Sequence, residues 1–383
     1  MSADHGTGAP ADVVLLGAGA IGRELVAQLL ARRARPLPVR LCALADSTGF
    51  LFDADGLPRR RLAAAVALKD SGGNLADAAG AHAGDAHAAL DVAARHALYR
   101  PILIDATAAD TGALLERALA AGFDLVLANK LPLATEQAAF DRLYLAARTR
   151  GRALLHEATV GAGLPVIDTL HRLLDGGDRV RRIEGCPSGT LGYLFGELGR
   201  GRAFSEALRG ALAAGYTEPD PRIDLAGLDV ARKALILARA LGYRGEPEGI
   251  PVESLVPASL RDVSRDEFLA RVGELDAGWA GRVRAAAARG RVLRYRARVT
   301  ARSIRVGLVA VRAGHPLGTL RGTDNQFAFT TARYARQPLV VTGPGAGPAV
   351  TAAGVLGDVL RLAAPRGLAA PPPAPARRVR EYA

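Results

Sequence analysis

The fold expected of this 383-residue chain depends on the segment Val13-Val14-Leu15-Leu16-Gly17-Ala18-Gly19-Ala20-Ile21-Gly22. The four apolar residues predict a short buried strand, and the apolar residues that follow the glycines recur at helical spacing. A Gly-x-Gly-x-x-Gly run is a weak signal alone, but between a strand and a helix it is typical of a dinucleotide-binding turn. The helix N-terminus then faces the pyrophosphate. The sequence therefore predicts that six residues contact the cofactor: Gly17, Ala18, Gly19, Ala20, Ile21 and Gly22.

The alternation of strand and helix continues to about residue 156. Further strands are expected at 39–45, 102–105, 124–128 and 153–156, with helices between them that include much of 75–95. This alternation predicts an α/β fold with a parallel, Rossmann-type sheet. Cofactors bind at the carboxyl ends of the strands in such sheets. Three residues at strand ends are therefore candidates for cofactor binding: Asp46, Thr107 and Lys130.

Asp46 bears on the choice between NAD and NADP. An acidic residue at the end of the second strand binds the ribose 2′-hydroxyl and disfavours a 2′-phosphate. Asp46 lies 24 residues beyond Gly22, slightly later than usual, and the nearby run Arg59 to Arg61 could favour a phosphate. A simple turn residue is the alternative interpretation of Asp46. The sequence leaves the choice between NAD and NADP open.

A second acidic region lies between Gly215 and Lys233. Pro219 and Pro221 keep its first part out of a helix, because each fixes its own φ and biases the preceding residue to extended geometry. From Asp224 to about residue 241 the apolar residues recur at helical spacing. Asp229 and Lys233 are four apart and should share one face of that helix. The plainest interpretation is a surface ion pair, which stabilises a helix by only a few tenths of a kcal/mol.

The scarcity of lysine favours a functional interpretation. Only three of the 50 basic residues are lysine, namely Lys69, Lys130 and Lys233, and the rest are arginine. Arginine stays protonated, whereas lysine can pass a proton. Lysines that persist in such a chain are candidates for a role that arginine cannot fill. Lys130 and Lys233 lie in motif-like surroundings, whereas Lys69 is assigned to a surface segment.

Composition excludes several classes of protein. The net charge of +12 invites a nucleic-acid interpretation, but aromatic residues make up only 5% and the arginines are scattered. No apolar run approaches the ~18 residues of a membrane span, and no secretory signal is evident. Cys42 and Cys186 lie far apart in apolar runs, which is typical of buried thiols in a reducing compartment. We expect a cytoplasmic protein that binds a small anionic molecule and no nucleic acid.

A corner with two glycines spans Glu157 to Pro165, between a strand and a helix. Such a corner can turn backbone carbonyls inward, which is how a monovalent cation is often held. A plain turn is the alternative, and the residues alone favour it. Beyond this corner, short helices and strands up to about residue 342 predict a second region of α+β type, and Ser188 is expected to cap a helix.

Taken together, these motifs resemble the homoserine dehydrogenase family. The matching segments occur in the family's order: 17–22, 129–130, 157–165, 188–190 with Tyr193 and Phe195, 215–233, 292–295 and 343–355. The resemblance implies reduction of aspartate 4-semialdehyde to homoserine with NADP or NAD, on the route to threonine, isoleucine and methionine. It also implies a homodimer.

The resemblance assigns roles to individual residues. Lys233 is the implied proton donor, Lys130 is a second lysine at the reacting oxygen, and Asp229 lies with them. Several further residues are placed near substrate or cofactor, namely Glu218, Asp224, Asp229, Gly189, Thr190 and Gly345. Carbonyls of four residues match the family's sodium site, namely Glu157, Val160, Ala162 and Leu164.

We expect five parts in the chain. They are a disordered lead (1–11), an NAD(P)-binding domain (12–160), a substrate-binding and dimerisation domain (161–340), a return segment that packs on the first domain (341–363) and a disordered tail (364–383). With no kinase segment or regulatory domain expected, the enzyme should be monofunctional and escape domain-borne threonine inhibition. Alternatives are a dehydrogenase for another amino-acid semialdehyde or hydroxy acid, and a non-catalytic NAD(P)-binding sensor.

Overall fold

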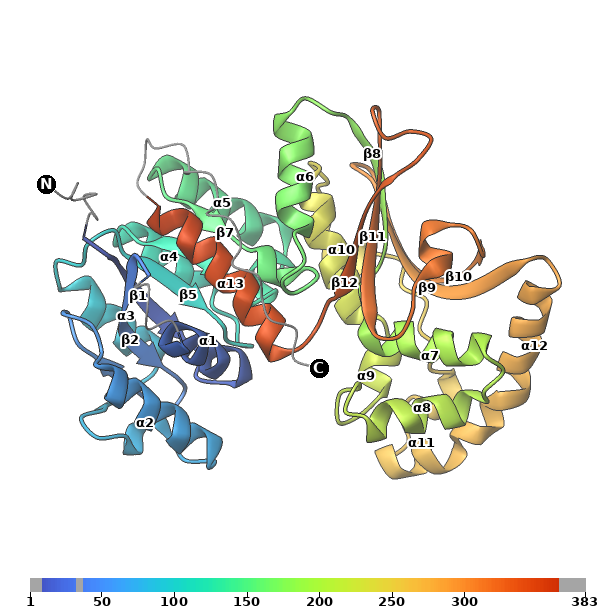
Figure 1. Ribbon diagram of the computed structural model, residues 1–383, viewed down its shortest axis with the longest axis horizontal. Coiled ribbons are helices and arrows are strands. Elements are labelled where there is room, and N and C mark those ends of the chain that lie inside the picture. Colours follow the sequence, from blue (N-terminus) through green and yellow to red (C-terminus); the bar gives the residue numbers. More distant parts are fainter. Residues whose placement is uncertain (1–8, 32–36, 365–383) are drawn as a thin grey trace, which may run out of the picture.

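The computed structural model describes residues 9–31 and 37–364, which form two sheets joined by helices (Figure 1). The α/β fold class is confirmed. Most of the predicted lead and nearly all of the predicted tail lie outside the described residues. Ala11, which was expected to belong to the lead, is instead the first residue of strand β1 and is only 1% exposed.

Within the described ranges, sheet A contains seven strands in the order β4-β3-β2-β1-β5-β6-β7. Strands β2, β1, β5, β6 and β7 are parallel, and β3 and β4 extend the sheet in antiparallel pairing. The strands are β1 (Ala11–Leu16), β2 (Val39–Ala45), β3 (Gly49–Phe52), β4 (His82–Ala83), β5 (Ile102–Asp105), β6 (Asp124–Leu127) and β7 (Leu154–Leu155).

Helices cover both faces of sheet A, as an apolar parallel sheet requires. Val14 and Leu16 of β1 join the core formed with α3, α4 and α5, whereas Val13 and Leu15 join the core formed with α1, α2 and α13. The helices are α1 (Ala20–Ala31), α2 (Arg59–Asp70), α3 (Ala86–Ala94), α4 (Gly112–Ala120), α5 (Gln137–Thr149) and α13 (Pro348–Ala363). The last of these is far from α1 in sequence but packs beside it (Figure 1).

The prediction of helix through much of 75–95 was wrong. This stretch contains a 3-10 turn, strand β4 and only then α3. Asp85 starts α3, because its side chain accepts hydrogen bonds from the amides of His87 and Ala88. The cap at Asp85 therefore marks the boundary between α3 and strand β4, which the apolar periodicity of the sequence did not predict.

Sheet B is antiparallel throughout, with the strand order β10-β9-β8-β11-β12. Its strands are β8 (Val180–Cys186), β9 (Arg291–Val299), β10 (Ile304–Arg312), β11 (Asp324–Thr331) and β12 (Leu339–Pro344). The associated helices are α6 (Val166–Asp175), α7 (Gly189–Gly199), α8 (Phe204–Ala213), α9 (Arg222–Leu225), α10 (Leu228–Ala240), α11 (Arg265–Arg271) and α12 (Asp276–Ala287). Short 3-10 turns are η1 (Leu75–Asp77), η2 (Leu131–Leu133), η3 (Glu157–Thr159), η4 (Pro247–Gly249), η5 (Ala258–Leu260), η6 (Val272–Leu275) and η7 (Pro316–Thr319).

The single helix expected from Asp224 to about residue 241 is two helices, α9 and α10. Gly227 separates them with a φ of +75°, a left-handed conformation that side chains rarely adopt. A Cβ at this position would lie 1.9 Å from the hydroxyl oxygen of Tyr295. The break lets α10 begin at Leu228, so that Asp229 lies in its first turn.

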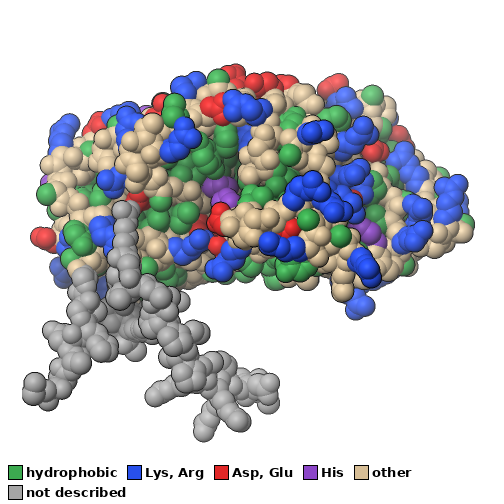
Figure 2. Space-filling view, turned by 90° about the horizontal axis from the view of Figure 1, so that it is seen from above, with side chains coloured by type: hydrophobic (Ala, Val, Ile, Leu, Met, Phe, Trp, Pro, Cys, Tyr) green, Lys and Arg blue, Asp and Glu red, His purple; other side chains and the backbone are tan. Residues whose placement is uncertain are grey.

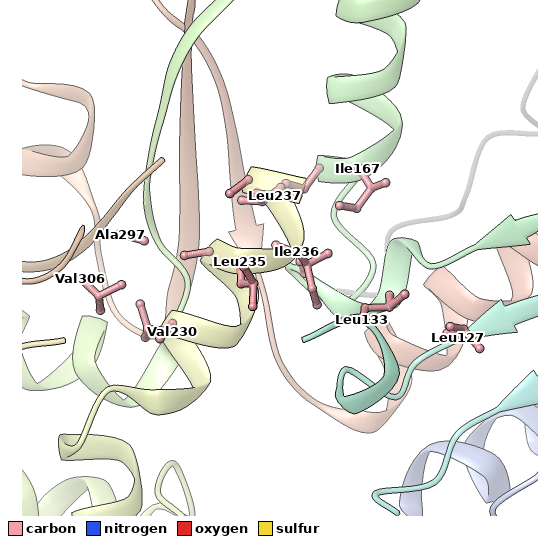
Figure 3. Close-up of a cluster of buried hydrophobic side chains, with 14 of the residues drawn as sticks. Leu127, Leu133, Ile167, Val230, Leu235, Ile236, Leu237, Ala297 and Val306 are labelled. Atoms are coloured by element: carbon pink, nitrogen blue, oxygen red, sulfur yellow. The ribbon is translucent and has the colours of Figure 1, made fainter. Parts of the chain in front are cut away.

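One apolar core runs from sheet A to sheet B through α10. Figure 3 shows Leu133 of the sheet A side near Ile236 of α10 and Leu127 beyond it, with Val230, Ala297 and Val306 toward sheet B. The helix that carries Asp229 and Lys233 therefore lies at the junction of the two halves.

The basic side chains are scattered over the surface (Figure 2) and the two cysteines are buried, as expected from the sequence. Figure 2 shows Lys and Arg spread from one end of the visible face to the other. Cys42 and Cys186 are both buried and free. Among the described residues, no helix is both long and apolar enough to cross a bilayer.

Candidate active site

In the predicted dinucleotide-binding turn, residues 17–22, helix α1 packs closely against the backbone of the turn. A Cβ at Gly22 would lie 1.8 Å from the carbonyl oxygen of Gly17, so α1 can approach the turn only with glycine there. A Cβ at Gly19 would meet nothing within 4 Å, which leaves open space at the N-terminus of α1. The amide groups that begin α1 face that space and can bind phosphate.

Asp46 follows β2 and is paired with Lys69 of α2, with 2.8 Å between Oδ2 and Nζ. Its Oδ1 accepts hydrogen bonds from the amide and hydroxyl of Thr48. Burial acts to raise the pKa of Asp46, but the hydrogen bonds from Lys69 and Thr48 outweigh it and lower the pKa. A cavity of about 290 Å³ adjoins this pair, lined by Ala18, Gly19, Arg23, Asp46, Ser47, Lys69, Gly72 and Gly73.

A buried carboxylate, Asp105, organises the ends of β5 and β6. Its Oδ1 accepts hydrogen bonds from the amide of Thr107 at 3.0 Å and from its hydroxyl at 2.7 Å. Its Oδ2 accepts from the hydroxyl of Thr111 at 2.5 Å and the amide nitrogen of Asn129 at 3.0 Å. Asn129 in turn accepts from the amide of Leu131. This network fixes the backbone on both sides of Lys130.

Lys130 and Lys233 both contact Asp229. Lys130 Nζ lies 3.1 Å from Asp229 Oδ1, and Lys233 Nζ lies 2.8 Å from Asp229 Oδ2. Lys233 Nζ also donates to the carbonyl of Pro187 at 2.7 Å. The predicted shared face of Asp229 and Lys233 is confirmed, and a lysine from the sheet A half completes the cluster.

The two ammonium groups keep Asp229 ionised. Burial acts to raise the pKa of Asp229, but the charges of Lys233 and Lys130 outweigh it and hold the pKa well below its usual range. Lys233 uses two of its three N–H groups for Asp229 and Pro187, so one remains to reach another acceptor.

Asp224 occupies a different environment from Asp229. Its Oδ1 accepts from the hydroxyl of Thr190 at 2.9 Å, and its Oδ2 accepts from the amide of Glu218 at 2.9 Å. Burial raises the pKa of Asp224. The Thr190 hydroxyl also contacts the carbonyl of Tyr216. Asp224 and Thr190 thus tie the acidic loop to the start of α7.

The remaining predicted residues lie around these groups. Ser188 caps α7, as predicted, by accepting from the amide of Leu191, and Gly189 is the first residue of that helix. The residue Glu218 is exposed, and within the described residues its carboxylate makes no hydrogen bond or ion pair. Gly345 lies between β12 and α13, and its carbonyl accepts from the side chain of Asn325 at 3.2 Å.

The corner from Glu157 to Leu164 contains two successive left-handed residues, Gly161 (φ +83°) and Ala162 (φ +56°). Val160 and Ala162 are buried, yet no N–H of the described residues donates to either carbonyl. Buried carbonyls normally have a partner. The Glu157 carbonyl accepts at the long distance of 3.3 Å from the Val160 amide, and the Leu164 carbonyl accepts from the Val166 amide at 2.8 Å.

Sequence reasoning missed four residues of this site. Lys69 was assigned to the surface but pairs with Asp46, and the scarcity of lysine was a signal that could have identified it. Asp105, the carbonyl of Pro187 and the side chain of Asn325 gave no comparable signal, because each acts through a contact between segments distant in sequence.

The geometry suits reduction of a carbonyl or the reverse reaction. An ammonium with a free N–H can stabilise and protonate an oxygen that becomes negative when hydride reaches its carbon. The described residues contain no cluster of three or more His, Cys, Asp or Glu side chains that could hold a metal ion.

Two family models match this chain in order. The model for the NAD-binding domain of homoserine dehydrogenase matches residues 17–157, and the homoserine dehydrogenase model matches residues 165–360. Together they cover both halves of the fold and include every candidate residue except those between the two ranges.

Individual proteins with homoserine dehydrogenase names are also similar to this chain. The bifunctional aspartokinase/homoserine dehydrogenase of Haemophilus influenzae is 38% identical over 91% of this chain, which spans 42% of that protein. The homoserine dehydrogenase of Saccharomyces cerevisiae is 37% identical over 92% of this chain and 98% of its own length. A crystal structure of a putative homoserine dehydrogenase from Archaeoglobus fulgidus is 26% identical, with a TM-score of 0.73 over 93% of this chain and 100% of that one. With the two models matched in order, and with a yeast relative covered almost from end to end, this chain belongs to the homoserine dehydrogenase family.

Proposed function

We propose that this protein interconverts aspartate 4-semialdehyde and L-homoserine with NADP or NAD. The observation that carries the proposal is the Lys130–Asp229–Lys233 cluster, which joins a strand end of the dinucleotide-binding half to helix α10. A reactive oxygen between the two lysines would lie beside a cofactor bound at the ends of β1 and β5. Family membership supports the same reaction.

Lys233 is the group proposed to hold the reacting proton. The bound dinucleotide supplies or accepts the hydride. In the reductive direction the aldehyde oxygen gains negative charge, and the third N–H of Lys233 is available to protonate it. Asp229 keeps both lysines close together, and Lys130 adds a second positive charge at the same oxygen.

Substrate recognition is assigned to the acidic loop and the start of α7. The free carboxylate of Glu218 is suited to the substrate's α-ammonium group. Asp224 is engaged by Thr190 and by the Glu218 amide, so it shapes the pocket and adds negative charge. Amides at the start of α7, which include Gly189, and the loop at Gly345 complete the proposed site.

A sodium ion is proposed at the corner formed by Glu157, Val160, Ala162 and Leu164. The buried carbonyls of Val160 and Ala162, to which no N–H of the described part of the chain donates, support it. A hard monovalent cation would satisfy oxygens of this kind. Its role there would be structural, because the corner joins sheet A to α6.

A homodimer formed through sheet B is also proposed. Helices α7, α10 and α12 contact the face that includes Tyr295 and Ala297. On the opposite face Arg298 and Arg305 are exposed, and Val340 of the edge strand β12 is 38% exposed. Light scattering on the purified protein should give about twice the chain mass of 39.8 kDa. The buried free thiols further support a cytoplasmic location.

The decisive assay is oxidation of L-homoserine followed at 340 nm with NADP and with NAD. Wild-type enzyme should turn over, and Lys233→Ala should lower kcat by about 100-fold or more. Lys233→Arg is the matched control for charge, because arginine cannot release the proton, and it should be nearly as slow. A Lys233→Ala enzyme with normal chemistry but lost binding would contradict the proton-donor role.

The alternatives have their own outcomes. Faster turnover of another ω-hydroxy amino acid than of L-homoserine would indicate a dehydrogenase for a different semialdehyde. Tight binding of NAD(P) without turnover of any such substrate would indicate a sensor.

A further inference from the structure

Arg239 is a buried basic residue on α10, the helix that carries Asp229 and Lys233. Its side chain donates from Nη1 to the carbonyl of Leu133 at 2.7 Å and from Nη2 to the carbonyl of Thr135 at 2.6 Å. The residue is only 6% exposed. Both carbonyls belong to the sheet A half, so Arg239 connects the two halves of the molecule.

The two carbonyls lie in the turn that begins at Lys130. Lys130 is the N-cap of η2, and its own carbonyl accepts from the amides of Leu133 at 3.1 Å and Ala134 at 2.9 Å. Asn129 fixes the start of the same turn through the amide of Leu131. Any movement of the Leu133 and Thr135 carbonyls would therefore also move Lys130.

Helix α10 thus meets the 130–135 segment at two points. The first is the Lys130–Asp229 ion pair near the helix start, and the second is Arg239 near its end. Arg239 lies ten positions after Asp229, which corresponds to about 15 Å along a helix. Between these two points, Leu133 and Ile236 belong to one apolar cluster, and their side chains lie near each other (Figure 3). Two polar contacts this far apart fix the angle of the helix as well as its distance from the turn.

We infer that Arg239 is a positioning residue, which holds the turn at Lys130 against α10 and so sets the distance from Lys130 to Asp229. An effect of Arg239 on catalysis rests on the proposed function. The position of Lys130 relative to Asp229 can be tested whether or not that function is correct.

Arginine is suited to this position because its planar guanidinium can donate to two carbonyls at once. The centroid of the Phe140 ring lies 4.6 Å from Cζ of Arg239, and the ring covers one face of the guanidinium group. Lysine at the same position would keep the charge but would lack the planar fork. Arg239→Lys should therefore retain part of the function, and Arg239→Ala should retain less.

Arg294 offers a matched control. It is equally buried, at 6% exposed, and donates to the carbonyls of Leu317, Gly318 and Leu320 at 2.9, 3.0 and 3.2 Å. All these contacts lie within the sheet B half and away from Lys130. Replacing Arg294 should destabilise the fold in the same way, by leaving buried carbonyls without a donor, but should not move Lys130, Asp229 or Lys233.

The kinetic test compares Arg239→Lys and Arg239→Ala with Arg294→Lys and Arg294→Ala, all at a temperature where each is folded. Misplacing a catalytic group by about 1 Å can cost about 100-fold in rate. We expect Arg239→Ala to lower kcat by about 10- to 100-fold while the KM for the dinucleotide changes by less than about twofold. Arg239→Lys should fall between Arg239→Ala and wild type, and the Arg294 variants should keep kcat within about twofold. Equal loss of kcat in the Arg239 and Arg294 variants would overturn the inference.

A second measurement does not need activity. The chain has three lysines, all among the described residues, so selective ¹³C labelling of lysine ε-carbons gives three signals that Lys→Arg variants can assign. Arg239→Ala, or Arg239→Lys if the alanine variant does not fold, should shift the Lys130 signal and leave the Lys69 signal in place. An unmoved Lys130 signal would refute the inference. A moved Lys130 signal in a protein whose wild type does not oxidise homoserine would uphold the positioning and refute the proposed function.

Discussion

Asp229 Oδ1 lies 3.1 Å from Lys130 Nζ, although the two residues belong to opposite halves of the molecule. Asp229 also binds Lys233 through its other oxygen. One carboxylate therefore holds two ammonium groups that would otherwise repel each other. The relative position of the two sheets determines whether this arrangement forms.

Replacing Asp229 by Asn should slow the reaction sharply. Asn cannot balance the two positive charges, so the lysines should separate and kcat should fall by about 100-fold, as for the loss of other preorganised charged groups. The measurement is kcat for L-homoserine with saturating cofactor. Asp220→Asn is the control, because Asp220 lies in the same acidic segment but pairs with Arg222. Equal effects of the two substitutions would argue against a special role for Asp229.

Lys69 should influence the choice of cofactor. Its ammonium lies 2.8 Å from Asp46 Oδ2 and offsets a charge that would repel a 2′-phosphate. Lys69→Met should therefore raise the KM for NADP by about tenfold relative to that for NAD, since a charge-assisted contact contributes roughly 1.5–3 kcal/mol. Lys69→Arg keeps the positive charge and should leave the ratio of the KM for NADP to the KM for NAD close to that of wild type. A Lys69→Met enzyme with the same ratio of KM values as wild type would show that Lys69 is only structural.

Thr190→Val should weaken homoserine binding more than it slows chemistry. Valine has a similar shape but cannot donate to Asp224 or to the carbonyl of Tyr216, so the acidic loop should loosen. Leaving a buried carboxylate oxygen without its donor costs roughly 1–3 kcal/mol, and the partly buried Asp224 should fall toward the lower end of that range. We expect the KM for L-homoserine to rise about tenfold with kcat within about threefold. Thr190→Ser keeps the hydroxyl and should behave like wild type, and a defect in the serine variant would point to packing instead.

The pH dependence of stability should reveal Glu157. Burial raises its pKa to about 7, from 4.5 for an unperturbed group. The folded protein therefore keeps a proton that the unfolded chain has lost between these values. The contribution of Glu157 to the free energy of unfolding accordingly falls as pH rises from about 4.5 to about 7, by at most about 1.4 kcal/mol per pH unit.

Urea unfolding of wild type and Glu157→Gln between pH 5 and pH 8 isolates this effect. The difference in unfolding free energy should favour wild type most at pH 5, decline to about pH 7 and then level off. The unfolding free energy of the variant must be subtracted from that of wild type, because His156 titrates in both proteins. Burial lowers the pKa of His156 to about 4, which makes stability rise with pH over a similar range. The exposed Glu248 provides the control, because Glu248→Gln makes the same chemical change at a distant surface position and should not reproduce the advantage of wild type at pH 5.

Local patterns predicted the parts of this protein that depend on neighbours in sequence. The strand, glycine turn and helix at 13–30, the cap at Ser188 and the face shared by Asp229 and Lys233 all follow from short-range rules. The break at Gly227 was missed because periodicity does not register a single left-handed residue, and the close approach of Tyr295 to Gly227 comes from 68 positions away in the chain. Periodicity also failed to reveal β4, a strand of two residues.

The candidate site was predicted as a set of residues but not as an arrangement. The resemblance named both lysines, but spacing alone could not show that Asp229 lies between them, because Lys130 precedes it by 99 positions. Asp224 was grouped with Asp229 as a substrate ligand, whereas its two oxygens bind Thr190 and the Glu218 amide. Whether it also touches substrate stays a prediction.

The packing of α13 beside α1 determines the order in which the molecule can be assembled during synthesis. Val355 and Val359 of α13 complete the apolar layer beneath β1, and Arg100 binds the carbonyls of Leu362, Ala363 and Ala364. A ribosome makes all of sheet B before it reaches these residues. The half that is translated first is therefore finished last, because its apolar layer stays incomplete until α13 has been made.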